Sequence, residues 1–388
     1  MKTQNNKTKT ATSIVTALLI GLVLMTPTAI VPNVSADTNQ VSKICRDQSE
    51  KTIHDTIKQI DYSKAKSIVT SASEFKTMAN GYNPTFESLY TTWHINKVDC
   101  SLTWNDTHVV YQIKDSSGKM KNLDFNLDPH LTKVNNVTEY QPVYNSFPVT
   151  GTSPTWAGYE FAGNSANTTS VLEAEAQYTQ PSVSKPSGFS CLSGAECRMS
   201  MWAGLENAWD GTNQNLAQTG TEGIVTCSGS CSSSYNMWWE LLPATETVCT
   251  SVTVNSGDSI TADVKNDILN SGGNANYYDF YSVDNTNGNV CAPGAQYYPQ
   301  LNSPTVAAFV NEHSSCGGSC TYPLAQFNTS TIAGWMYYSS SLKDISNPYS
   351  SGNYVAITMK NGGTTNVSIN SVGGTGSFTS TYQSSSGT

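Results

Sequence analysis

Histidine is scarce in the second part of this chain, and its scarcity narrows the possible chemistry. Only one of the five histidines, His313, lies after residue 150. Neither a two-histidine zinc site nor an HExxH pattern can therefore form there, and a Ser-His-Asp triad in that region would have to use His313 without a GxSxG turn. No aspartate there lies in the Ser/Thr-Gly turn of an aspartic dyad. We expect no metal ion or other cofactor, and neither a serine nucleophile nor an aspartic dyad.

Basic residues are also scarce after residue 150. Residues 151–388 hold 5 Lys and Arg against 16 Asp and Glu, whereas residues 37–150 hold 12 against 13. An acidic, lysine-poor region does not bind a phosphate backbone, which argues against nucleic acid as a partner. Acid would protonate its carboxylates and leave few charges, so the composition suits a low-pH medium. An ordinary soluble exported protein would also fit.

The only long apolar run is at the N-terminus. Lys2, Lys7 and Lys9 precede an apolar stretch over 14–25, and Val34-Ser35-Ala36 resembles a cleavage site. This pattern predicts a signal peptide over 1–36 and a secreted, extracellular protein without stable membrane association after cleavage.

Ten cysteines in an exported chain favour disulfides over thiols or zinc ligands. Three closely spaced pairs look like local loop closures, and the remaining four cysteines can pair within their own regions. The expected pairs are Cys191/Cys197, Cys227/Cys231, Cys316/Cys320, Cys249/Cys291 and Cys45/Cys100.

Residues 37–150 read as a small α+β unit. Ile53, Ile57 and Ile60 recur at helical spacing, with Ser49 as a candidate N-cap, and residues 108–127 read as strand, turn, strand. The proline-containing stretch 140–155 reads as a linker. From about 155 onward we find short β-like runs between Gly, Asn, Ser and Pro clusters and no convincing helical period.

This pattern favours an antiparallel sandwich or barrel over 151–388, with the clearest hairpin at 353–372 and a tail after Gly373 that is flexible or a frayed last strand. Strand alternation in YNMWWELLP places Asn236, Trp238, Glu240 and Leu242 on one face. In AAFVNEH, Glu312 shares a face with two small apolar residues. Burying such a carboxylate is costly unless something hydrogen-bonds it.

Five segments together resemble the glutamic peptidases, or eqolisins, in order and approximate spacing: WAGLEN, LAQTGTE, YNMWWELLP, VNSGDSITADV and AAFVNEH. Upstream, TWAGYEFAG and AEAQYTQPSVS resemble that family's opening strands, so the resemblance covers about 155–335. It implies a secreted, acid-active endopeptidase made with a propeptide. The implied fold is an all-β, two-sheet antiparallel β-sandwich of the concanavalin A or lectin-like kind, here residues 151–388, preceded by a small α+β propeptide, residues 37–150.

Carried over residue by residue, the resemblance implies Gln218 and Glu312 as the catalytic pair. It implies cleft or supporting roles for a second set of residues, namely Trp156, Trp202, Trp238 and Glu240. Several positions depart from the family pattern: Ala308 in place of a second acid, His313 in place of an aspartate, and Leu241 and Leu242 in place of aromatics. A cationic His313 beside Glu312 in acid would put the pH range in doubt.

In this interpretation Glu312 is a general base that activates water, and Gln218 donates to the oxyanion. The substrates would be proteins or peptides, the enzyme a monomer, and the propeptide an intramolecular inhibitor and folding aid that acid loosens. Two alternatives stay open from the residues alone. One is a lectin-like glycosidase that uses Glu240 and Glu312 as paired carboxylates, and the other is a non-catalytic adhesin or sugar-binding module.

Overall fold

A computed structural model describes residues 40–114, 118, 120–140, 151–162, 170–207, 215–266, 276–317, 320–338, 341–344, 354–373 and 376–385. The chain divides into two compact units, residues 1–36 and residues 37–388. The first unit lies outside the described residues, so the signal peptide stays a prediction. Among the described helices, none combines the length and the apolar character that a bilayer crossing requires.

Three helices begin the second unit: α1 (Lys43–Ile57), α2 (Tyr62–Ser71) and α3 (Ser73–Met78). Ser42, not Ser49, caps α1, because its hydroxyl accepts from the backbone N–H of Cys45 at 3.2 Å. Ser49 is instead buried inside the helix. Ile53 and Ile57 lie on the buried side of α1 as expected, whereas Ile60 follows the helix end.

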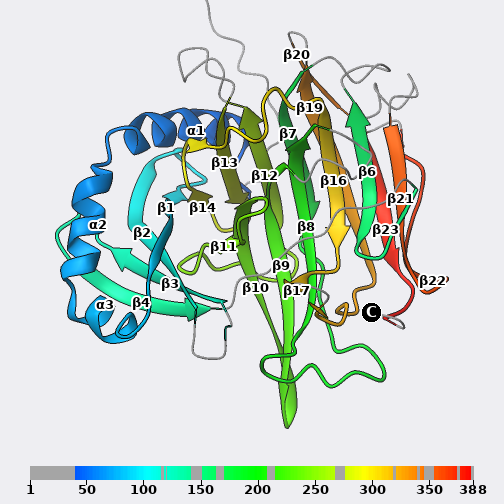
Figure 1. Cartoon of the computed structure of the whole chain (residues 1–388). Coiled ribbons are helices and arrows are strands. Elements are labelled where there is room, and N and C mark those ends of the chain that lie inside the picture. The colour runs from blue at the N-terminus through cyan, green and yellow to red at the C-terminus, as the bar shows by residue number, and fades with distance from the viewer. Residues whose placement is uncertain are drawn as a thin grey trace, which may run out of the picture. The chain divides into compact units, whose positions relative to one another are not determined.

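Strands make up most of the rest, and two sheets contain nearly all of them (Figure 1). Residues 37–150 contribute β1 (Thr85–Ile95), β2 (Leu102–Lys114), β3 (Met120–Leu127) and β4 (Val134–Tyr140). The first sheet also contains β7 (Val171–Thr179), β12 (Ser259–Asn266), β13 (Tyr277–Asp284), β14 (Asn289–Ala292), β19 (Thr329–Tyr338), β22 (Thr364–Ile369) and β23 (Ser377–Tyr382). The second contains β6 (Trp156–Ala162), β8 (Cys197–Glu206), β9 (Leu216–Ser228), β10 (Ser230–Leu241), β11 (Thr247–Val248), β16 (Val306–Glu312) and β21 (Tyr354–Asn361). Short strands β5 (Thr152–Ser153), β15 (Gln296–Tyr297), β17 (Ser315–Gly317), β18 (Cys320–Thr321) and β20 (Ser341–Asp344) lie at sheet edges or in connections.

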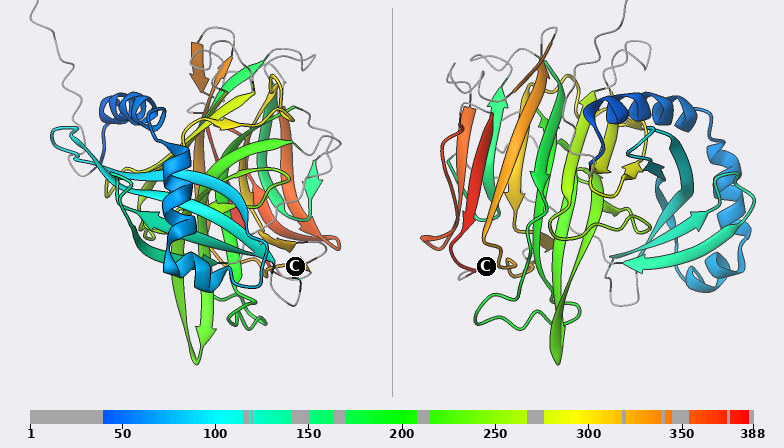
Figure 2. Two further views of the ribbon diagram at one scale, coloured as in Figure 1. Left: turned by 60° about the vertical axis from the view of Figure 1, so that its left-hand side comes forward. Right: turned by 180° about the vertical axis from the view of Figure 1, so that it is seen from behind.

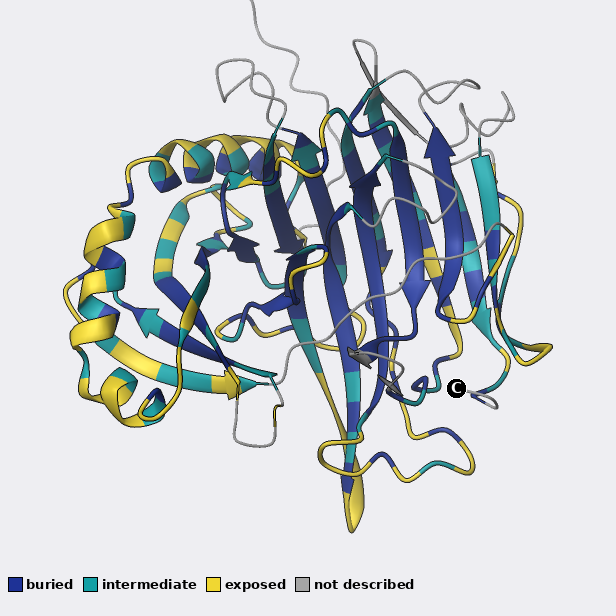
Figure 3. Cartoon of the chain, in the orientation of Figure 1, coloured by how far each residue is buried: buried dark blue, intermediate teal, exposed yellow. Residues whose placement is uncertain are grey.

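The second sheet runs in the order β21-β6-β16-β8-β9-β10-β11, and all of these pairings are antiparallel. Its inner face packs on the β7 and β12 strands of the first sheet in one large apolar core, which Figure 3 shows as an almost uniformly buried set of strands. Tyr178 of β7 bridges the two layers by donating to the carbonyl of Met201 in β8 at 3.0 Å. The predicted antiparallel two-sheet sandwich is therefore confirmed.

The region before residue 150 joins the first sheet directly. Strand β1 pairs with β14, so that Thr91 lies opposite Ala292 and Trp93 opposite Val290. The apolar cluster beneath α1 to α3 is completed by four residues beyond position 150, Tyr281, Val283, Val290 and Ala292. Both views in Figure 2 show the helices and β1 to β4 together on this edge of the sandwich. The domain boundary at 150 stays a prediction. The described contacts join residues before and after this position.

The structure also bears on the predicted disulfides, the 353–372 hairpin and the C-terminal tail. Four predicted disulfides are present, Cys45–Cys100, Cys191–Cys197, Cys227–Cys231 and Cys249–Cys291. The side chains of Cys316 and Cys320 lie outside the described part. The 353–372 hairpin is confirmed as β21 and β22. Of the two expectations for the tail after Gly373, a last strand is the one present, because β23 pairs with β19 at five positions.

Candidate active site

All six predicted site residues lie on one face of the second sheet, the face turned away from the large core. Glu312 on β16 is opposite Trp156 on β6 and Ser200 on β8, while Gln218 on β9 is opposite Glu240 on β10. Directly paired residues point to the same side of an antiparallel sheet. The three tryptophans of the set, Trp156, Trp202 and Trp238, form one apolar cluster on this face.

Glu312 is held between two indole rings. Trp156 Nε1 donates to Oε1 at 2.9 Å and Trp202 Nε1 donates to Oε2 at 2.6 Å. The two rings meet edge to face, with centroids 4.9 Å apart. The carboxyl is only 1% exposed. Burial raises the pKa of Glu312 well above its usual value, and the two indole hydrogen bonds oppose that rise.

Gln218 is fully buried, and its Nε2 donates to Glu240 Oε2 at 2.6 Å. Its Oε1 has no hydrogen-bond partner within the described residues. A primary amide nitrogen carries two hydrogens, so one N–H remains after the bond to Glu240. The register of the β9-β10 hairpin produces this contact, because it places Gln218 directly opposite Glu240.

The two halves of the site are neighbours without a direct bond. Strand β8 separates β9 from β16, and in a flat sheet this register would put the Cα atoms of Gln218 and Glu312 roughly 16 Å apart. The Glu240 carboxyl is near enough for its charge to raise the pKa of Glu312. A substrate on this face could thus lie between the Glu312 carboxyl on one side and the Gln218 amide donor on the other.

Glycine lets the indole rings pack flat between the strands. Gly220 lies opposite both Trp202 and Trp238. A Cβ on Gly220 would lie 2.0 Å from the carbonyl oxygen of Met201 and 2.7 Å from Trp202 Cβ, which no real side chain tolerates. The glycine is therefore required by the close approach of the β8 backbone at Met201 and Trp202, the strand from which Trp202 reaches Glu312.

Of the positions that depart from the family pattern, Ala308 and Leu242 lie on this face, whereas Leu241 packs against the large core. Ala308 is buried among the site tryptophans, as is Leu242. His313 is buried, its backbone N–H donates to Thr155 O at 2.8 Å, and its Nε2 contacts the Tyr322 carbonyl. Burial lowers the pKa of His313 to about 4. Burial thus disfavours the cationic ring, so that His313 carries a charge beside Glu312 only below about pH 4.

A cavity of about 230 Å³ lies beside the site, and sequence reasoning missed it. Arg198 Nη1 donates to Glu222 Oε2 at 2.9 Å, and Ser314 Oγ donates to Glu222 Oε1 at 2.7 Å. Arg198 also lies over the ring of Tyr322 at 4.1 Å. Alternation from Gln218 would have placed Glu222 on the site face, but its partners follow only from cross-strand register.

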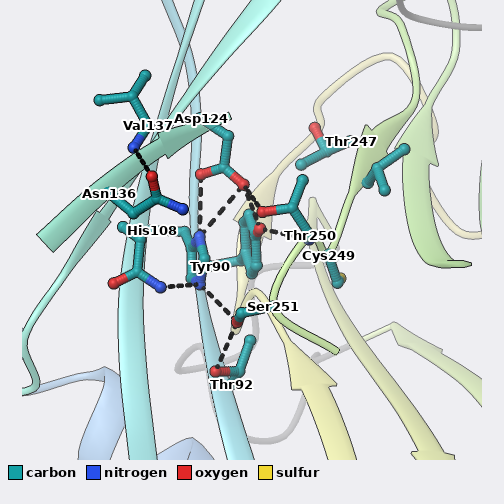
Figure 4. A network of polar contacts seen from close by, with 12 residues as sticks. Tyr90, Thr92, His108, Asp124, Asn136, Val137, Thr247, Cys249, Thr250 and Ser251 are labelled. Carbon is teal, nitrogen blue, oxygen red and sulfur yellow. Dashed lines mark hydrogen bonds and ion pairs between the residues drawn. The ribbon is translucent and has the colours of Figure 1, made fainter. Parts of the chain in front are cut away.

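A second polar cluster joins residues 37–150 to the sandwich (Figure 4). His108 contacts Asp124 Oδ1 through Nδ1 at 3.0 Å and Ser251 Oγ through Nε2 at 2.9 Å. Tyr90 stacks on the His108 ring, and its hydroxyl donates to Asp124 Oδ2 at 2.6 Å. Thr250 Oγ1 donates to the same oxygen at 2.7 Å. These residues have the order of a Ser-His-Asp triad, which a search confined to residues after 150 could not find. They are, however, shared between two regions, since His108 and Asp124 precede residue 150 and Ser251 follows it.

Helix α1 forms ion pairs with the outer face of the first sheet. Arg46 lies 3.6 Å from Glu175, and His54 lies 2.8 Å from Asp279. Lys265 of the sandwich contacts Glu50 of α1. The carboxylates of Glu173, Glu175 and Asp263 lie within 4.8 Å of one another on this face. Cations from both regions thus meet a cluster of acids at the interface.

Comparison with known proteins gives the family of the chain. Among solved structures it is similar to scytalido-glutamic peptidase with a transition-state analogue inhibitor, at 17% identity and a TM-score of 0.45, over 59% of this chain and 98% of that one. It is also similar to aspergilloglutamic peptidase from Aspergillus niger, at 20% identity and a TM-score of 0.40, over 48% and 99%. A search of curated proteins gave no match.

The model of the Peptidase A4 family matches residues 154–382. This match decides against the glycosidase and the adhesin, and it means that proteins or peptides are the substrates. Because it spans more than half of the sequence, the chain belongs to the Peptidase A4 family and is a glutamic peptidase, a hydrolase.

Proposed function

We propose that this chain is a secreted endopeptidase that works in acid with Glu312 as general base and Gln218 as oxyanion donor. The observation that supports this most is the environment of Glu312, whose two carboxyl oxygens each accept an indole N–H on the face that also holds Gln218. Such donors favour and orient an ionised carboxylate. An amide that keeps a free N–H is the matching partner for developing negative charge.

The reaction follows from these two groups. The Glu312 carboxylate takes a proton from a water whose oxygen attacks the scissile carbonyl carbon. The carbonyl oxygen becomes an oxyanion and accepts from Gln218 Nε2, which Glu240 orients through its other hydrogen. Collapse of the tetrahedral intermediate breaks the C–N bond, and Glu312 returns the proton to the leaving amine. Because an amide donor does not titrate, this chemistry suits low pH, where a histidine base would be protonated.

The propeptide, residues 37–150, is proposed to keep the enzyme silent and to assist its folding. In the intact chain Glu312 is buried, and desolvation raises its pKa, which favours the neutral form, a poor base, in acid. The shared apolar cluster, the α1 ion pairs and the His108 network all tie the propeptide to the sandwich. Loss of the propeptide would admit water to the cleft and lower the pKa of Glu312.

Secretion follows the signal peptide proposed at 1–36 and agrees with four disulfides in the described part of the chain. We further propose that the mature enzyme works as a monomer. Size-exclusion chromatography with light scattering before and after acid treatment would show whether the active species has the mass of a single sandwich domain.

The catalytic proposal is tested with the full chain in acid. A denatured protein is incubated with wild type, Glu312→Ala, Gln218→Ala and the control Gln177→Ala, in the presence of a pepstatin-type inhibitor against aspartic peptidases. We expect no cleavage by Glu312→Ala, and a loss of about 10²–10³ in rate for Gln218→Ala. Gln177 is partly buried on the outer face of the first sheet and should be dispensable. Equal cleavage by wild type and Glu312→Ala would overturn the assignment.

A further inference from the structure

Tyr140, the last residue of β4, is a residue of the proposed propeptide that packs on the site face of the second sheet. Its ring packs against the apolar cluster that contains the three site tryptophans. Its hydroxyl accepts from the backbone N–H of Val248 at 3.2 Å and from Asn122 Nδ2 at 3.3 Å. Val248 in β11 lies opposite Trp238 in β10. A propeptide side chain therefore occupies a place on the cleft wall of the sandwich.

The 230 Å³ cavity continues from this place. Thr138 and Tyr140 of β4 form one wall, and residues beyond position 150 form the other; the latter are Arg198, Glu222, Ile224, Asn236, Val248 and Thr250. If β4 leaves, the space of the Tyr140 ring and the cavity merge. The merged space opens on the face that holds Glu312.

The distance to the reacting groups fits a substrate subsite. Glu222 lies opposite Ser200, which lies opposite Glu312, so this near wall is two strand spacings from Glu312, about 10 Å. Val248 on the far wall is four strand spacings from the strand of Glu312, but it lies only two strand spacings and two residues from Gln218, about 12 Å. An extended peptide advances roughly 3.3 Å per residue. The cavity therefore lies within about three residues of the scissile bond of a peptide that crosses the strands.

We propose that Tyr140 fills a specificity subsite of this peptidase, and that the subsite binds a tyrosine, or another aromatic side chain, of peptide substrates. The inference rests on the proposed catalytic function and names the side chain that it selects. Ile224 and Val248 supply apolar walls. Once Tyr140 leaves, the Val248 N–H loses its acceptor and can donate to the hydroxyl of a substrate tyrosine. Arg198 already pairs with Glu222, so a charged substrate side chain finds no free counter-ion there.

The test uses the full chain activated in acid and one peptide sequence varied at each of three positions on either side of the scissile bond. Each position carries Tyr, Phe, Ala or Asp in turn, and kcat/KM is measured. At one fixed position we expect Tyr to exceed Ala by about tenfold or more, since apolar pocket contacts discriminate on this scale. Phe should fall about two- to tenfold below Tyr, because it lacks the hydroxyl for Val248. Asp should be worst.

Two further measurements keep the result specific to this site. Val248→Phe should lower kcat/KM for the Tyr peptide to that of the Ala peptide, whereas Val355→Phe, on the same face at the opposite edge of the sheet, should preserve the preference. A synthetic peptide of residues 134–140 should inhibit the activated enzyme, and its Tyr140→Ala form should inhibit about tenfold less or weaker still. This second readout does not depend on a variant that folds.

The failures are distinguishable. An enzyme that cleaves these peptides but shows no position with a Tyr preference above about twofold refutes the subsite and leaves the catalytic proposal intact. A Tyr preference that survives in Val248→Phe also refutes it. Cleavage that survives in Glu312→Ala refutes the catalytic proposal instead.

Discussion

The indole of Trp202 should set the pH at which this peptidase gains activity. Its Nε1–H donates to Glu312 Oε2 at 2.6 Å in a site where the carboxyl is 1% exposed. The substitution Trp202→Phe removes the donor and keeps an aromatic ring. A hydrogen bond to a charged group contributes about 1.5–3 kcal/mol. Since one pKa unit is about 1.4 kcal/mol, the pKa of Glu312 should rise by about 1–2 units.

Trp238→Phe is the matched control. Trp238 is equally buried, lies across Gly220 from Trp202, and has an Nε1 that finds no acceptor among the described residues. Both substitutions remove the same atoms and the same volume. Only Trp202→Phe removes a hydrogen bond from the proposed base, so a difference between the variants reports that bond and not packing.

The assay is the pH profile of kcat/KM for a peptide substrate with the activated enzyme. If Glu312 is the base, its deprotonation gives the acid limb of the profile. We expect this limb to move up by about 1–2 pH units in Trp202→Phe and to stay in place in Trp238→Phe. Equal shifts in both variants, or no shift in either, would refute the reasoning that the indole stabilises an ionised catalytic carboxylate.

Three shorter predictions follow from other contacts. Gly220→Ala should abolish soluble, folded protein, measured by yield and circular dichroism, because its Cβ would lie 2.0 Å from Met201 O; a well-folded, active variant would contradict the packing described. Burial raises the pKa of Glu160 from 4.5 to about 8. The protonated carboxyl therefore contributes its full stability to the fold below about pH 4.5, and this contribution is lost as pH rises through 8. Glu160→Gln should therefore flatten the fall of the urea midpoint between pH 5 and pH 8, and an unchanged slope would count against it. Arg46→Ala, which breaks a largely buried pair with Glu175, should shorten the time to activity after acidification, and an unchanged time would show that this pair does not retain the propeptide.

Part of this structure could be predicted from local sequence patterns. Alternation alone places Trp238 and Glu240 on one face, and the β10 register agrees. Spacing alone suggested the short disulfide loops, such as Cys191–Cys197. These features depend on residues close together in the chain, whose geometry is fixed by the period of a strand or the reach of a short loop.

Other features depend on contacts between distant segments and had no local signal. The spacing of the isoleucines in α1 suggested Ser49 as a cap, but six residues of helix precede it, because packing of α1 on the sheet extends the helix back to its cap at Ser42. The partners of Glu312, two indoles from β6 and β8, follow from strand order. The resemblance named these tryptophans without giving their role as donors. The Arg198–Glu222 pair and the His108 network likewise require the three-dimensional register.

Burial of Glu312, the proposed base, implies that acid does not switch this enzyme on at once. Desolvation already raises the pKa of Glu312 in the intact chain, and lowering the pH drives the group further toward its neutral, inactive form. Activity must therefore await water entry into the cleft, for which loss of the propeptide is the proposed route. Acidified wild type should accordingly show a lag before peptide cleavage begins. A chain that cleaves at full rate from the moment of acidification, with its propeptide still attached, would mean that Glu312 is not the base or is not buried in solution.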